Sequence, residues 1–419
     1  MVYDDLRQYR FIIQHIWKKN KGYRDFLGNN GNMTTVTAII CEYNPFHLGH
    51  AAQIAHIRKK DPETVILALM SGSFVQRGTP ALFPKYDRAR GAVLSGADLV
   101  LELPFPFCMA PAERFASAGV SLLHSLGGVD RLFFGSESGD LSALCLTAER
   151  MGSTEYRAAL ADAAMKARHS SLSHPRLAEE VYVSLYGEGY PVTPNDILAV
   201  EYLRALDRFH AKTVPETEKR VPGYSASAAR EAIRQDDGSL SRLIPPETLA
   251  LLRSVPTADE RRLESAVLSF YRLADPASLR SLPGYVPGLE YRLTGAADEA
   301  ENLSDFYARL RTKKETDASL RRIVYYGLVG VTGDLLAGLP RYTTLLAANE
   351  KGCAVLKELK KTALLPILTR PAEGKRLTGG AAVQFEAAVR ADKLFSLAKS
   401  SDRTENPFRK TPYIEGERT

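Results

Sequence analysis

The alternation of apolar runs with helix-like stretches constrains the fold of this chain more than any other feature of its sequence. In chain order, these runs and stretches lie at 36–41, 48–60, 64–70, 86–96, 97–104, 112–126 and 129–137. Continuous apolar strands separated by helices are typical of a parallel sheet that is covered on both faces. The pattern therefore predicts an α/β fold with a Rossmann-like parallel sheet, whose ligands bind beyond the carboxyl ends of the strands.

The length of the chain and a change in the sequence pattern near residue 240 indicate more than one domain. At 419 residues the chain is longer than one ordinary domain. Two adjacent prolines at 245 and 246 precede a long region of mainly helical pattern. We expect an N-terminal extension at 1–32 and a catalytic α/β domain at 33–240. A mainly α-helical domain at 241–399 and a C-terminal tail at 400–419 follow. Met33, just before the first strand, is an alternative start of the protein.

Cysteine usage, apolar runs and charge narrow the function classes. The four cysteines are scattered and form no CxxC pair, so the sequence predicts neither a zinc cluster nor a disulfide framework. The chain has no membrane-spanning apolar run and no recognisable secretory signal, so we expect a cytoplasmic protein without a membrane partner. The net charge of +6 fits a polyanionic partner and equally fits solubility charge alone. The oligomeric state stays open.

The strongest chemical signal is NPFHLGH, at 44–50, between the first strand and the first helix. His47 and His50 are three residues apart, so both imidazoles lie at the first turn of the helix, beside unsatisfied backbone N–H groups. Pro45 stiffens the turn, and Gly49 removes a side chain where phosphate approaches the backbone. We predict that both histidines are catalytic and stabilise charge on a departing pyrophosphate. A zinc site would need a third ligand that the pattern lacks.

Cations and small residues follow the other strands. Arg77 and Lys85 come after the second strand and are candidates for binding phosphate or a carboxylate substrate. Gly135 ends the fourth strand, where the missing side chain would let an adenine or ribose lie against the backbone. Ser227 and Arg230, in a serine-rich turn that opens a helix, are further phosphate candidates. Surface charge, a turn glycine and a helix cap are the alternative explanations.

As a set, these segments resemble the tRNA(Met) cytidine acetate ligase family of the nucleotidyltransferase superfamily. The resemblance is carried by EYNPFHLGH, MSGSFVQRGTPALFPK, GADLVLELPF, LFFGSE, TPNDILAVEY and SASAAR. It is dense over 36–235 and looser up to the closing NPFRKTPYI. It implies an enzyme that condenses acetate with ATP to acetyl-adenylate and then acetylates the wobble cytidine of elongator methionine tRNA. ATP would be the co-substrate, with Mg²⁺ offsetting the triphosphate charge.

The same resemblance implies which residues bind ATP. They are Ile40, Cys41, Glu42, Tyr43, Asn44, Pro45, Phe46, His47, Leu48, Gly49, His50, Ala51, Ala52, Gln53, Gly135, Asn195 and Arg220. The chain departs from the family pattern in its N-terminal extension. The segment between Arg220 and the SASAAR turn is also shorter than usual, and Ala229 stands where a larger aliphatic residue is common.

Basic residues of the helical region are candidates for contacting tRNA phosphates. They are Arg309, Arg311, Lys313, Lys314, Arg321 and Arg322, with a second group at Lys357, Lys360 and Lys361. A solvated helix face with interspersed carboxylates would give the same pattern.

Two other functions remain open at this point. The first is a small-molecule adenylyltransferase of the same fold, which would not need the long basic helical region. The second is a nucleotide-binding or RNA-binding protein without turnover, against which the intact His47, Gly49 and His50 argue.

Overall fold

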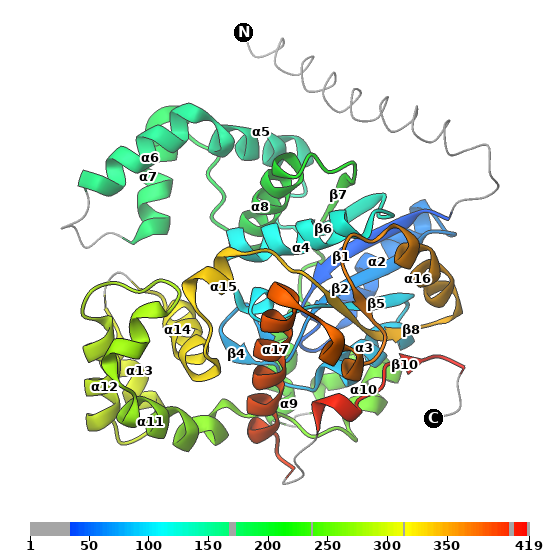
Figure 1. The fold of residues 1–419 in the computed structure, drawn as a ribbon. Coiled ribbons are helices and arrows are strands. Elements are labelled where there is room, and N and C mark those ends of the chain that lie inside the picture. The colour runs from blue at the N-terminus through cyan, green and yellow to red at the C-terminus, as the bar shows by residue number, and fades with distance from the viewer. Residues whose placement is uncertain (1–33, 167–172, 236–237, 313–314, 402–405, 417–419) are drawn as a thin grey trace.

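One sheet forms the centre of the computed structural model, which describes residues 34–166, 173–235, 238–312, 315–401 and 406–416. Within these ranges eight strands lie in the order β10-β8-β5-β2-β1-β6-β7, with β9 paired to β8 (Figure 1). The strands are β1 (Val36–Cys41), β2 (Val65–Ser71), β5 (Leu99–Leu103), β6 (Arg131–Ser136), β7 (Val214–Lys219), β8 (Thr343–Ala348), β9 (Ile367–Leu368) and β10 (Tyr413–Ile414). The expected extension at 1–32 and the start at Met33 lie outside the described residues.

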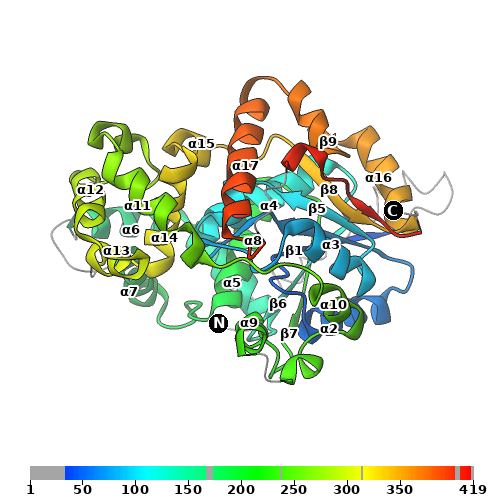
Figure 2. The same cartoon turned by 90° about the horizontal axis from the view of Figure 1, so that it is seen from below.

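Helices cover both faces of this sheet, as the alternating pattern predicts. Along β1, Ala38 and Ile40 pack into one apolar core, whereas Ile39 and Cys41 pack into the other. The first core is closed by α4 (Ala112–Leu126), α8 (Pro194–Arg208) and α16 (Glu350–Thr362), and the second by α2 (Leu48–Lys60) and α3 (Lys85–Leu94). Figure 2 shows α16 and α3 on opposite sides of the sheet. The predicted fold class is confirmed.

The strands that were not predicted from the sequence include β7, β8 and β10. β7 is polar and half-exposed, because it pairs only with β6 at one edge of the sheet and needs no apolar run. β8 comes from the region expected to be mainly helical and pairs antiparallel with β5, so the sheet is mixed rather than purely parallel. β10, in the C-terminal tail, pairs with β8. The chain after residue 240 therefore returns to the sheet, and the domain boundary there remains a proposal.

The other elements form an arm, a hairpin and a helical bundle. Before residue 240 they are the hairpin β3 (Phe74–Val75) and β4 (Thr79–Pro80), η1 (Phe107–Met109), α5 (Leu141–Gly152), α6 (Thr154–Lys166), α7 (His174–Tyr186), α9 (Ala226–Gln235) and, at the boundary, η3 (Ser239–Arg242). After it come α10 (Pro246–Leu252), η4 (Glu260–Leu263), α11 (Glu264–Leu273), η5 (Pro276–Ser281), α12 (Leu289–Glu299), α13 (Leu303–Leu310), α14 (Asp317–Val329), α15 (Gly333–Ala337), η6 (Pro371–Arg376), α17 (Gly379–Ala398) and η7 (Pro407–Arg409). The arm consists of α5, α6 and α7, and the helical bundle consists of α11, α12, α13 and α14.

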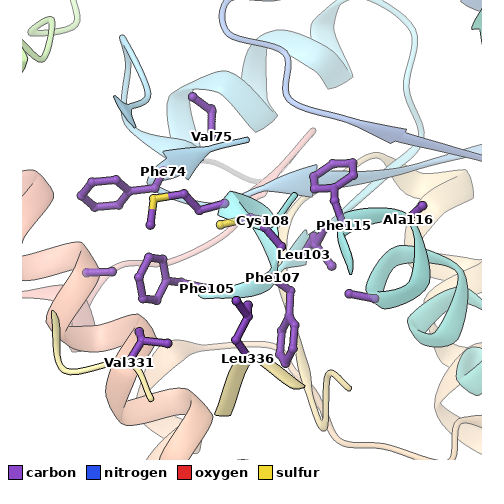
Figure 3. Close-up of a cluster of buried hydrophobic side chains, with 14 of the residues drawn as sticks. Phe74, Val75, Leu103, Phe105, Phe107, Cys108, Phe115, Ala116, Val331 and Leu336 are labelled. Atoms are coloured by element: carbon purple, nitrogen blue, oxygen red, sulfur yellow. The ribbon is translucent and has the colours of Figure 1, made fainter. Parts of the chain in front are cut away.

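An apolar cluster joins the hairpin and η1 to the helical bundle. Phe74 of β3 lies 5.3 Å, centroid to centroid, from Tyr325 of α14. Phe105, just before η1, lies 6.2 Å from Tyr326. Figure 3 shows Phe74 and Phe105 close to Val331 on the bundle side. Because buried aromatic side chains dominate the energy of such contacts, this cluster fixes the bundle against the sheet domain.

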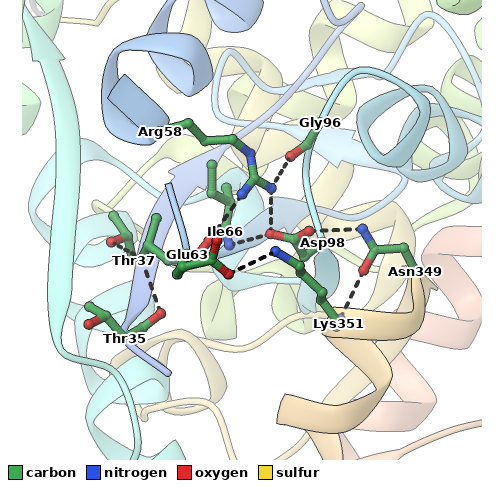
Figure 4. A network of polar contacts seen from close by, with 11 residues as sticks. Thr35, Thr37, Arg58, Glu63, Ile66, Gly96, Asp98, Asn349 and Lys351 are labelled. Carbon is green, nitrogen blue, oxygen red and sulfur yellow. Dashed lines mark hydrogen bonds and ion pairs between the residues drawn. The ribbon is translucent and has the colours of Figure 1, made fainter. Parts of the chain in front are cut away.

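Asp98 ties the first half of the sheet to β8 and α16 (Figure 4). Its carboxylate accepts hydrogen bonds from Arg58 Nη2 at 2.7 Å, the Ile66 backbone N–H at 2.8 Å and Asn349 Nδ2 at 2.8 Å. Asn349 in turn caps α16 by accepting from the Gly352 N–H at 2.9 Å. A buried carboxylate needs such partners, so the late strand is an integral part of the sheet.

The structure also bears on membrane spans, disulfides and metal-binding clusters. None of the helices in the described ranges is both long and apolar enough to cross a bilayer. Cys41, Cys108, Cys145 and Cys353 are free thiols. Among the described residues, no group of three or more His, Cys, Asp or Glu side chains is arranged to hold a metal ion.

Candidate active site

A cavity of about 370 Å³ opens beside the carboxyl ends of β1, β6 and β7. It lies where ligands are expected in an open α/β sheet. Candidate residues that line it are Ile40, Cys41, Glu42, Tyr43, Asn44, His47, Gly49, His50, Gln53, Arg77, Gly135, Asn195, Arg220 and Ser227. The fold therefore brings most of the predicted site into one place.

His47 and His50 form a stacked pair at the start of α2. His47 is the N-cap residue, and its Nδ1 accepts a hydrogen bond from the Gly49 N–H at 3.1 Å. The Nδ1 of His50 accepts from the His47 N–H at 3.2 Å, and the ring centroids are 3.7 Å apart. Because each Nδ1 is an acceptor, the proton of each neutral ring sits on Nε2. Two Nε2–H donors are thus available at the cavity wall.

Burial keeps both imidazoles neutral. Burial, together with the charges of Arg220 and Arg230, lowers the pKa of His47 to about 4. The pKa of His50 is well below its usual range, because of burial and the neighbouring His47. The rings therefore act near pH 7 as neutral hydrogen-bond donors, and not as cations or as general bases.

The expectation that unsatisfied backbone N–H groups bind the anion is wrong. The Leu48 N–H donates to Leu243 O at 2.8 Å, the Gly49 N–H to His47 Nδ1, and the His50 N–H to His47 O at 2.9 Å. Gly49 also has another purpose than close approach by phosphate. A Cβ there would lie 2.9 Å from Cε1 of His47 and 3.1 Å from Cβ of Tyr224. Glycine is therefore required so that the imidazole can fold over the helix start.

The turn between β1 and α2 is held in an unusual backbone conformation. Tyr43 has a φ of +44°, in the left-handed region that costs a side-chain-bearing residue free energy. Its buried ring packs edge-on against Phe46 and His50, with both pairs of centroids 4.8 Å apart. This packing holds the turn in its left-handed conformation and fixes the positions of the two histidines.

Gly135, Asn195 and Arg220 meet through Glu137. The Glu137 carboxylate accepts from Asn195 Nδ2 at 2.6 Å and lies 3.8 Å from Arg220 Nη1. A Cβ at Gly135 would lie 3.1 Å from Cγ of Arg220, so this glycine makes room for the arginine, and its contact with a base or ribose stays a prediction. Glu137, which closes the LFFGSE motif, organises these residues and was not predicted from the sequence.

Some candidates do not reach the cavity. Of the segment 40–53, the residues outside the lining are Pro45, Phe46, Leu48, Ala51 and Ala52. Arg230 does not line the cavity but holds two residues that do. It donates hydrogen bonds to Asn44 O at 2.8 Å and to Ser227 Oγ at 3.0 Å. Lys85 is buried, and its ammonium contacts Glu102 and Asp392, each at 2.8 Å. These two carboxylates neutralise its charge and favour a structural role, and its role in phosphate binding stays a prediction.

The basic residues predicted to contact tRNA are largely engaged with the protein itself. Arg309 pairs with Glu299 and Asp305, and Arg311 pairs with Asp317. Arg321 lies over the ring of Tyr307 at 5.5 Å, and Arg322 donates to Gln76 O at 3.0 Å. The exposed Lys357, Lys360 and Lys361 lie on α16, whereas Lys313 and Lys314 fall outside the described residues. Their contact with tRNA stays a prediction.

Comparison with known proteins agrees with this geometry. The model of the HIGH Nucleotidyl Transferase family matches residues 33–409. The tRNA(Met) cytidine acetate ligase of Anoxybacillus flavithermus is 32% identical, over 79% of this chain and 88% of its own length. That of Caldanaerobacter subterraneus is 31% identical, over 86% and 94% respectively. The chain belongs to the tRNA(Met) cytidine acetate ligase family.

A solved structure of the family shares the fold over nearly the whole chain. The crystal structure of Thermotoga maritima TmcAL bound with alpha-thio ATP has a TM-score of 0.83 and 28% identity. It covers 91% of this chain, which in turn covers 99% of that chain. An apo structure of the same protein gives a TM-score of 0.84. The family resemblance stated from the motifs is thereby confirmed.

Proposed function

We propose that this protein is an ATP-dependent ligase that activates acetate as acetyl-adenylate and acetylates the wobble cytidine of elongator methionine tRNA. The observation that carries the proposal is the pair of neutral imidazoles whose Nε2–H groups are available at the cavity wall. Relatives of matching length carry the name tRNA(Met) cytidine acetate ligase, which supports the acceptor. A tRNA substrate also fits a cytoplasmic location.

In the first half-reaction, acetate attacks the α-phosphate of ATP, and the bond to pyrophosphate breaks. We assign the triphosphate to the wall that carries His47, His50 and Arg220. Their N–H groups would stabilise the negative charge that develops on pyrophosphate. Mg²⁺ would enter with the ATP phosphates and offset their charge.

In the second half-reaction, the exocyclic amine of cytidine attacks the acetyl carbon and displaces AMP. The base must leave the stacked anticodon loop to enter the cavity. The helical region after residue 240, anchored to the sheet domain by the Phe74–Tyr325 contact, is the proposed tRNA-binding part. A small-molecule adenylyltransferase and a protein that binds nucleotides without turnover are the alternatives that the following experiment separates.

The direct test incubates purified protein with ATP, Mg²⁺, radiolabelled acetate and unmodified methionine tRNA, followed by nucleoside analysis. We expect labelled N4-acetylcytidine that depends on ATP. Pyrophosphate release that requires acetate, without label in tRNA, would mean another acceptor. Absence of both would favour one of the two alternatives.

Substitution of Gly135 by alanine tests the nucleotide wall. The added Cβ would lie 3.1 Å from Arg220 Cγ and displace the arginine from its place beside Glu137. We expect the Kd for a non-hydrolysable ATP analogue, measured by calorimetry, to rise about tenfold, or ~1.4 kcal/mol. Gly152→Ala is the matched control, because a Cβ there has no neighbour within 4 Å. Equal Kd values for the two variants would remove Arg220 from nucleotide binding.

A further inference from the structure

We propose that Glu42 is the proton acceptor of the acetyl-transfer step, an inference that rests on the proposed function. In this step the cytidine N4 forms a bond to the acetyl carbon, and the C–O bond to AMP breaks. AMP leaves with that electron pair, and N4 gives up one proton. The N4 lone pair is delocalised into the base, so the amine attacks well only if a base takes this proton. Glu42 would receive it and release it to solvent.

The position of Glu42 suits this task. It follows β1 directly and lines the same cavity as His47, His50 and Gly135. Its Oε1 accepts a hydrogen bond from the Gln76 N–H at 2.8 Å. Within the described residues, its side chain has no further hydrogen-bond donor, so the second oxygen is open to a substrate in the cavity.

The other carboxylates of the cavity wall are already engaged. Glu137 accepts from Thr193 Oγ1 at 3.0 Å, from Asn195 Nδ2 at 2.6 Å and from the Asp196 N–H at 3.1 Å. Glu218 is paired with His56 Nδ1 at 2.6 Å. Taking up a proton at either would break bonds that hold the wall together.

The two histidines of the wall are poor proton acceptors as well. The Nδ1 atoms of His47 and His50 are occupied by backbone N–H groups, which leaves Nε2 as a donor. Burial lowers the pKa of both rings, so an imidazolium would be unstable there. Among the described residues that line the cavity, Glu42 is therefore the carboxylate that can take up the proton. One of its oxygens accepts no hydrogen bond from the protein, and its side chain lines the cavity.

Several groups set the charge state of Glu42. Burial raises the pKa of its carboxyl above the usual range, while the Gln76 hydrogen bond and the charges of Arg230, Arg88 and Arg77 oppose this effect. Tyr202 of α8 also faces it, and the Cys41 thiol precedes it, but burial raises the pKa of both and keeps them neutral. A carboxylate with a raised pKa is a stronger base than an exposed one.

The helical bundle holds the partner of Glu42 in place. Gln76 lies in the hairpin between β3 and β4, and its carbonyl accepts from Arg322 Nη1 of α14 at 3.0 Å. At the neighbouring Gly78, where φ is +79°, a Cβ would lie 2.9 Å from the Arg322 backbone nitrogen. The hairpin is therefore packed tightly on α14. Arg322 is thus a positioning residue for Glu42, whatever its contact with tRNA.

Glu42→Gln tests the proposal, because an amide oxygen can still accept from Gln76 while the group can no longer take up a proton. The two half-reactions are measured separately. Acetate-dependent pyrophosphate release without tRNA measures any effect of the change on ATP binding, because Glu42 lines the ATP cavity. Single-turnover transfer from enzyme-bound acetyl-adenylate to tRNA should fall about 10²–10⁴-fold. Glu216→Gln is the matched control, since Glu216, on β7, pairs with Arg131 of β6 and is not part of the cavity wall.

The pH dependence of the transfer rate distinguishes a proton acceptor from a residue that only supports the structure. Glu42 accepts a proton only when ionised, so the wild-type rate should fall as the pH falls through its raised pKa. The residual rate of Glu42→Gln should lack this limb.

Three outcomes would overturn the inference. Transfer by Glu42→Gln at the wild-type rate would mean that substrate phosphate or water takes the proton. Equal losses in both half-reactions would mean that Glu42 acts on ATP or on folding. A wild-type protein that forms acetyl-adenylate but labels no tRNA would refute the proposed function, and this inference with it.

Discussion

Replacing His50 by alanine should reduce acetate-dependent pyrophosphate release about 10²–10³-fold, because it removes an N–H donor from the charge that develops on the leaving group. The Nδ1 of His50 also accepts the His47 N–H, so a small loss of stability accompanies the change. Loss of such a cap costs about 1 kcal/mol. Turnover is measured by a coupled pyrophosphate assay, and the fold by circular dichroism during thermal unfolding.

His124→Ala is the control for this substitution, since His124 is an exposed residue in the last turn of α4. It should leave both turnover and the unfolding midpoint unchanged. If His50→Ala retained the wild-type turnover, the imidazole pair would have no part in adenylation. A large fall in the unfolding midpoint would instead assign His50 a mainly structural role.

The charge state of the pair makes a second measurement informative. The pKa of His47 is lowered to about 4 and that of His50 lies well below its usual range, so both rings remain neutral as the pH falls from about 8 to 6. Pyrophosphate release should therefore show no histidine-linked change over this interval. A rise in rate toward pH 6 would indicate that an imidazolium, and not a neutral donor, is the active form.

Sequence reasoning worked where a local signal decided the structure. The predicted strand at 36–41 and helices at 48–60 and 112–126 coincide with β1, α2 and α4, because apolar periodicity alone sets them. It failed for the polar β7, whose edge position requires no apolar run. It also failed for β8, because pairing with a strand more than two hundred residues earlier leaves no mark in the local pattern.

In the candidate site, too, local signals could be read from the sequence and long-range contacts could not. His47 and His50 could be predicted because strand, turn and helix follow one another within the chain. Glu137 could not be predicted as an organising residue, because its partners come from a later helix. Lys85 was predicted to bind phosphate because its position after a strand is local information, whereas its partner Asp392 is 307 residues away. Residue types near a strand end indicate a site, but long-range partners decide which of them are free to act.

Replacing Lys85 by methionine should lower the free energy of unfolding by about 3–5 kcal/mol, because it leaves Glu102 and Asp392 buried together without a cation. Burial by itself would lower the pKa of Lys85, but Asp392 and Glu102 outweigh it and raise this pKa well above its usual range. Asp392 lies on α17 and also accepts from Ser73 Oγ at 2.6 Å. The triad therefore joins the last long helix to α3 and β5, and chemical denaturation measures its contribution.

Two further variants separate the structural role of Lys85 from phosphate binding. Lys351→Met is the control, because the Lys351–Glu63 pair, at 3.4 Å, is largely exposed, and removing it should change stability by less than about 1 kcal/mol. Adding Glu102→Gln and Asp392→Asn to Lys85→Met should recover most of the lost stability, since no unpaired charge then remains buried. If Lys85→Met instead weakened binding of an ATP analogue while leaving the free energy of unfolding unchanged, the ammonium would reach the nucleotide despite its two carboxylate partners. The structural assignment of Lys85 would then be wrong.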